Sequence, residues 1–108
     1  MKKFVFIYHS SDIARNATQE EKKASMDKWM AWFGTFQDKM VDGGNPFAPE
    51  GTAVSANGVK TVTEAMTPAT GYTIINAQDM KEAVEIAKGC PLTESANGEV
   101  RVYEALPM

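Results

Sequence analysis

The sequence contains one cysteine and one histidine among its 108 residues. A single cysteine cannot form an internal disulfide, and together with one histidine it cannot supply the ligands of a structural zinc site. Basic side chains are also few, 11 against 14 acidic ones, and the resulting net charge of -3 argues against a protein that binds nucleic acid through phosphates. Disulfide scaffolds and zinc folds are therefore excluded, and no nucleic-acid partner is expected.

Long hydrophobic runs are absent as well. Near the N-terminus, the apolar run Phe4–Tyr8 follows two lysines, but it is shorter than the roughly 7–15 residues of a signal-peptide core and the ~20 of a membrane span. We therefore expect a cytoplasmic protein with no membrane partner. With 44% hydrophobic residues, the chain can form one core, so residues 1–108 are expected to be a single domain.

The first predicted strand, residues 3–8, is apolar on both faces. Phe4, Phe6 and Tyr8 alternate with Val5 and Ile7, so neither side of the strand is suited to water. A strand of this kind is typical of a sheet that is covered on both sides.

A long helix is predicted next. The segment Thr18-Gln19-Glu20-Glu21 fits a capping box at its start, and Gly43-Gly44 followed by Pro46 predicts its end near Asp42. Apolar residues recur at spacings of three and four and define the expected core stripe. They are Met26, Trp29, Met30, Phe33, Phe36 and Met40.

The second half of the chain predicts a hairpin, a strand, a helix and a final strand. Asn57-Gly58 favours a type I′ turn between strands at 52–56 and 59–64. Residues 72–76 favour a further strand, Asp79 to Gly89 a second helix, and 99–104 the last strand. The plan β-α-β-β-α-β with an added hairpin predicts a ferredoxin-like α+β sandwich.

Both helices of such a fold cover the same face of the sheet, so the other face remains open. Because the first strand is apolar on both faces, we predict a homodimer packed through the sheet face. The alternative is a monomer in which the loop at 43–51 folds over that face.

Several segments together resemble the YCII-related proteins, including their DGPF branch. They are Phe4–Tyr8, Trp29–Phe33, Asp42-Gly43-Gly44, residues 71–77, residues 79–87, Cys90-Pro91 and residues 99–102. The resemblance implies a dimeric α+β barrel, and it implies no established activity, since much of that family has none.

This chain departs from the family at two places. The DGPF motif is absent, because the corresponding stretch reads Glu64-Ala65-Met66-Thr67-Pro68. Asp42 matches the aspartate of a histidine–aspartate pair found in enzymes of this type, but the first helix contains no histidine.

His9 and Asp42 are the candidates for catalysis. His9 follows the first strand, where functional residues often gather, and with Asp42 it could form an acid–base pair if the fold brought them together. The alternative is that His9 is an ordinary hydrogen-bonding residue and that Asp42 lies in a solvated helix end. Cys90 is not expected to be a nucleophile at the C-terminal end of a helix. No residue spacing indicates a metal site or a cofactor.

The first helix carries an aromatic cluster formed by Trp29, Trp32, Phe33 and Phe36. Its spacing favours a core face, but it has more aromatic surface than one helix needs to bury. We expect Tyr8, Trp32 and Tyr72 to line a pocket for a small apolar or weakly acidic ligand between the sheet and this helix. The sequence thus predicts a small-molecule-binding or accessory module. The alternatives are a cofactor-independent monooxygenase or isomerase with His9 as base, and a structural interaction domain.

Overall fold

The computed structural model describes residues 1–10 and 18–108. Its strands are β1 (Lys2–Ser10), β2 (Met40–Asp42), β3 (Gly51–Ser55), β4 (Gly58–Val62), β5 (Ala69–Ala77) and β6 (Gly98–Ala105). Its α-helices are α1 (Gln19–Thr35) and α2 (Met80–Ala87), and short 3-10 helices span Gln37–Lys39, Glu64–Met66 and Pro91–Glu94.

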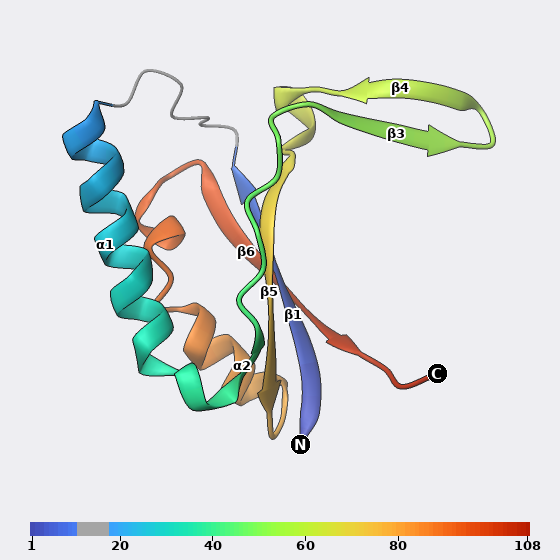
Figure 1. Cartoon of the computed structure of the whole chain (residues 1–108). Coiled ribbons are helices and arrows are strands. Elements are labelled where there is room, and N and C mark those ends of the chain that lie inside the picture. The colour runs from blue at the N-terminus through green and yellow to red at the C-terminus, as the bar shows by residue number, and fades with distance from the viewer. Residues whose placement is uncertain (11–17) are drawn as a thin grey trace.

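Four strands form an antiparallel sheet in the order β2-β5-β1-β6, while β3 and β4 form a separate two-stranded sheet. Figure 1 shows the sheet nearly edge-on, with α1 and α2 on one side and the β3–β4 hairpin projecting to the other. The arrangement is a ferredoxin-like α+β fold with an added hairpin, as the sequence predicted.

The core lies between the helices and the sheet. Phe4 and Phe6 of β1 are fully buried there, and their neighbour on β5, Ile75, is buried beside them. Val5 and Ile7 alternate with these residues and lie half-buried on the opposite face, which the helices leave uncovered. We call this second surface the open face.

The start of α1 follows the sequence prediction. The Glu21 amide donates to the Thr18 hydroxyl at 3.1 Å, and the Thr18 amide donates to the Glu21 carboxylate at 3.4 Å. This is the predicted capping box. At α2 the Asp79 carboxylate likewise accepts from the Glu82 amide at 2.9 Å.

The predicted end of α1 is wrong. The helix ends at Thr35, whose hydroxyl donates to the Trp32 carbonyl at 2.6 Å, and Met40–Asp42 forms β2. Met40 pairs with Ile75 on β5, so ladder hydrogen bonds replace those of a longer helix. Met40 and Asp42 are therefore strand residues at the edge of the sheet.

The β3–β4 hairpin is present, but its turn differs from the predicted type I′. Ser55 pairs with Gly58, which places Ala56 and Asn57 at the centre of the turn. Gly58 has a φ of 117°, whereas Thr67 is the one non-glycine residue of positive φ within 1–10 and 18–108. Asn57 therefore lacks the left-handed geometry that a type I′ turn requires.

The segment between β2 and β3 lies along the edge of β5 and does not cross the open face. Pro46 bridges to Gly71, and the Phe47 amide donates to the Thr70 carbonyl at 2.8 Å. In Figure 1 the segment runs beside β5 on its way to the hairpin. The loop that could have covered the open face of a monomer instead extends the sheet edge.

Candidate functional site

A cavity of about 820 Å³ lies between α1 and the edge of the sheet. It is lined by the first three turns of α1 and by Phe33, by Tyr8 from β1, and by residues 43–46 and 70–72. It lies in the region where we expected a ligand pocket, between the sheet and the first helix, and ligand binding there stays a prediction.

The helical wall of the cavity is apolar and largely aromatic. Met26, Trp29 and Phe33 recur at spacings of three and four residues, so they share one face of α1. The rings of Trp29 and Phe33 lie 6.0 Å apart. Met26 remains 62% exposed, so this part of the wall is open to solvent.

Tyr8 adds an aromatic ring from the sheet, in contact with the helical wall. Its ring meets the ring of Trp29 edge to face at 4.8 Å, and its hydroxyl lies 2.6 Å from the Thr73 hydroxyl. The Thr73 hydroxyl donates to the Gly43 carbonyl at 2.9 Å, so Tyr8 is the donor to Thr73. Burial raises the pKa of the Tyr8 phenol well above its ordinary value. The cavity therefore contains a neutral, fixed phenol.

The wall formed by residues 43–46 depends on two glycines, Gly44 and Gly71. Gly44 has a φ of 78°, and a Cβ atom there would overlap the carbonyl oxygen of Tyr72. A Cβ atom on Gly71 would lie 3.1 Å from the Asn45 carbonyl oxygen. These two glycines allow the segment to lie directly against β5, which closes the cavity on the side away from α1.

Asp42 fixes the start of the same wall. One carboxylate oxygen accepts from the Gly44 amide at 2.8 Å, and the other accepts from the Tyr72 hydroxyl at 3.4 Å. The Tyr72 ring stacks on Phe47 with centroids 5.8 Å apart. Asp42 thus has a structural role in the turn after β2. Tyr72 is among the residues around the cavity, but it is in register with Ile7 and alternates with Thr73, so its side chain lies on the open face.

His9 lies on the open face, because it alternates with Tyr8 along β1. Its Nδ1 atom is 2.9 Å from the Thr67 carbonyl oxygen. Asp42 is in register with Ile74 and hence with Val5, four residues before His9. Four strand residues span roughly 14 Å, so the structure does not bring His9 and Asp42 together. A ligand in the cavity would lie on the other side of the sheet from His9.

The structure also corrects the place of Trp32. This residue is 5% exposed, stacks on Phe6 at 6.1 Å, and donates from Nε1 to the Ile86 carbonyl at 2.9 Å. It belongs to the core, and Trp29 and Phe33 line the cavity in its place. The sequence grouped the aromatic residues of this helix in one cluster, and only the packing of α1 in the tertiary structure decides which of them enter the core.

Cys90 is buried, and burial raises the pKa of its thiol to about 11. It is therefore protonated at neutral pH and unsuited to nucleophilic attack. Within residues 1–10 and 18–108, no group of three or more His, Cys, Asp or Glu side chains is placed to hold a metal ion. Over the same residues, no helix is long and apolar enough to cross a membrane.

Comparisons with known proteins agree with the fold. A solved structure of 5-chloro-2-hydroxyhydroquinone dehydrochlorinase (TftG) from Burkholderia phenoliruptrix AC1100, in complex with 2,5-dihydroxybenzoquinone, is similar with a TM-score of 0.57. The match covers 94% of this chain and 90% of that one, at 14% sequence identity. No family model and no curated protein sequence matches the chain. The likeness supports the ferredoxin-like α+β architecture over nearly the whole length.

Proposed function

We propose that this protein is a homodimeric member of the YCII-related family that binds a small, flat, apolar or weakly acidic molecule in the cavity beside α1. The cavity is the observation that carries the proposal. Its volume of about 820 Å³ falls within the range of small-molecule sites, roughly 300–1,000 Å³. Its walls are mainly apolar and are formed by aromatic rings and glycine backbone, as is common in such sites.

The lining indicates the chemistry of the ligand. The rings of Tyr8, Trp29 and Phe33 offer flat surfaces that suit a planar molecule. The polar side chains Glu21, Lys22 and Ser25 lie on the exposed first turns of α1, at the solvent end of the lining. A ligand with a flat apolar body and a weakly acidic group near that end would match both regions. TftG was solved with 2,5-dihydroxybenzoquinone, a planar ring with ionisable hydroxyls, which is consistent with this class.

Two methionines of α1 provide a matched test of binding. Met26 lines the cavity and Met30 does not, yet both are exposed, at 62% and 60%. Replacing either by tryptophan should therefore be tolerated by the fold. In Met26→Trp the larger side chain should fill part of the cavity, whereas in Met30→Trp it should extend into solvent.

Isothermal titration calorimetry with 2-naphthol, a flat and weakly acidic probe, measures the effect. We expect saturable binding to the wild-type protein, a loss of at least tenfold in affinity for Met26→Trp, and a change below twofold for Met30→Trp. If 2-naphthol binds both variants with the wild-type affinity, its site is not this cavity. If neither 2-naphthol nor 2,5-dihydroxybenzoquinone binds at all, the proposed ligand class is refuted.

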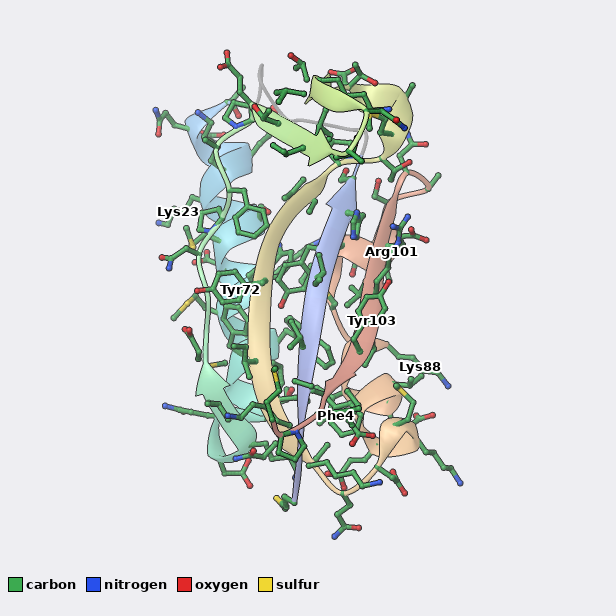
Figure 2. The ribbon with its side chains drawn as sticks, turned by 90° about the vertical axis from the view of Figure 1, so that its right-hand side faces the viewer. Phe4, Lys23, Tyr72, Lys88, Arg101 and Tyr103 are labelled. Carbon is green, nitrogen blue, oxygen red and sulfur yellow. The ribbon has the colours of Figure 1, made fainter. Side chains whose placement is uncertain are left out.

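The open face supports the homodimer. Val5, Ile7 and Ile74 lie half-buried there, and Tyr103 on β6 is 55% exposed beside them. Figure 2 looks onto this face and shows Arg101 and Tyr103 along β6. The charge of Arg101 is neutralised by an ion pair with Glu99. The apolar side chains at the middle of this face are suited to burial against a second sheet.

Sedimentation equilibrium tests the association. At 10 µM protein we expect the mass of two chains of 11.8 kDa each. Replacement of Ile7 by lysine should shift the protein to one chain, because two such charges would be buried near each other in a symmetric interface. A wild-type mass of one chain at 100 µM would refute the homodimer but would leave the cavity proposal intact.

A further inference from the structure

The strands of the β3–β4 hairpin pair with each other and do not join the four-stranded sheet. The hairpin forms a two-stranded sheet of its own, and all of its residues except Ala53 and Val62 are exposed. In Figure 1 it projects away from α1 and α2, on the side of the open face, and in Figure 2 it stands at one end of that face. An isolated two-stranded hairpin is marginally stable in water, so packing against another surface would stabilise it.

One face of the hairpin is uncharged and β-branched. Val54 pairs directly with Val59, and Thr52 pairs with Thr61, so the alternation of strands places these four side chains on the same face. Val54 is 77% exposed and Val59 is 70% exposed. Lys60, the charged residue of the two strands, belongs to the opposite face. We call Thr52, Val54, Val59 and Thr61 the valine face.

Exposed strands usually carry charges that prevent association. The valine face has none, and its two valines are among the most exposed large apolar side chains of the residues described. It therefore has the composition of a buried interface surface rather than of a solvated one.

We propose that the hairpin is an arm of the homodimer, with its valine face buried against the second copy of the chain. This inference rests on the homodimer proposed above. A second copy is the occupant that the geometry favours, because the hairpin projects on the side where the partner's sheet would pack. In a two-fold interface each arm reaches the other chain, so every contact is made twice.

The size of the open face supports the same occupant. Its long strands β1, β5 and β6 are up to nine residues in length, which gives a projected area of roughly 400 Å² at about 3.4 Å per residue and about 4.8 Å between strands. A stable interface buries roughly 800 Å² on each partner. The hairpin is the neighbouring exposed apolar surface that can add to the contact area of the sheet.

Lysine substitutions on the two faces of the hairpin test the arm. Val54→Lys and Val59→Lys place a charge on the valine face, while Ser55→Lys places the same charge on the opposite face next to it. All three positions are exposed within one chain, so the fold of the protomer should be retained. The pair Val54→Thr and Val59→Thr keeps the shape and the β-branching and removes only apolar surface.

The dimer dissociation constant, measured by sedimentation equilibrium, is the readout. We expect each valine-to-lysine variant to raise it at least tenfold, the double threonine variant to raise it several-fold, and Ser55→Lys to change it less than threefold. Far-UV circular dichroism and 2-naphthol binding should be unchanged in all of them, which separates loss of association from unfolding.

Two results would overturn the inference, and each of them has a different consequence for the homodimer. If the wild-type protein is a monomer, the homodimer and the arm both fail. If the wild-type protein is a dimer and the lysine and threonine variants keep its dissociation constant, the homodimer stands and the arm alone is refuted.

Discussion

Gly44→Ala is expected to destabilise the protein and to open the cavity wall. Gly44 has a φ of 78°, a conformation that costs a residue with a Cβ atom roughly 1–2 kcal/mol. The added Cβ would also overlap the Tyr72 carbonyl oxygen, so residues 43–46 would have to move away from β5. That movement would break the hydrogen bond from the Gly44 amide to Asp42, which contributes about 1 kcal/mol to stability. These two contributions give an expected loss of about 2–3 kcal/mol.

Gly34→Ala is the matched control, because the same chemical change is expected to have the opposite sign. Gly34 lies within α1, and a Cβ atom there would meet no other atom within 4 Å. Alanine in a helix is more favourable than glycine by about 0.5–1 kcal/mol. The two variants should thus differ in free energy of unfolding by about 2.5–4 kcal/mol.

Urea denaturation at one fixed protein concentration, followed by far-UV circular dichroism, measures both values. Binding of 2-naphthol should weaken in Gly44→Ala and remain unchanged in Gly34→Ala. The reasoning would be refuted if Gly44→Ala unfolded within 0.5 kcal/mol of the wild type, since the segment could then move without cost. Equal affinity in both glycine variants would show that residues 43–46 do not form the wall of the ligand site.

Two further predictions concern stability. The thiol pKa of Cys90 is raised to about 11, above its value in an unfolded chain, so this group contributes stability that is complete below about pH 8.5 and is lost as the pH rises toward 11. Between pH 8 and pH 10 the wild type should lose about 1–2 kcal/mol more than Cys90→Ala in urea titrations, and parallel pH profiles would contradict this. Thr18→Ala removes the hydroxyl that accepts from Glu21, and we expect a loss of about 1 kcal/mol. Thr18→Ser keeps the acceptor and should retain most of the wild-type stability, so an equal loss in both variants would argue against the cap.

Local signals in the sequence were sufficient for much of the fold. The capping box at Thr18, the first strand with two apolar faces and the hairpin around Asn57 all rest on contacts between residues close together in the chain or on simple alternation. Such contacts are encoded by neighbouring side chains, so periodicity and turn residues reveal them.

The errors fall where distant segments compete with local preference. Met40 continued a helical stripe in the sequence, but in the structure it pairs with Ile75, 35 residues later, and belongs to a strand. Asp42 therefore lies at a sheet edge, where it holds the turn to Gly44 and has no contact with His9. Neither result can be derived from spacing along the chain, because the partner strand is remote.

The sequence by itself determined the fold class, the start of α1, the second helix and the hairpin, and it indicated a surface left uncovered by the helices. Only the tertiary structure decided that Trp32 enters the core while Trp29 and Phe33 line the cavity, because contacts of Trp32 with Phe6 and Ile86, which are remote in the chain, set which face of α1 is buried. Only the structure showed why Gly44 and Gly71 are needed, since their neighbours come from remote parts of the chain. Local side chains specify helices and strands, whereas the walls of a site depend on how those elements meet.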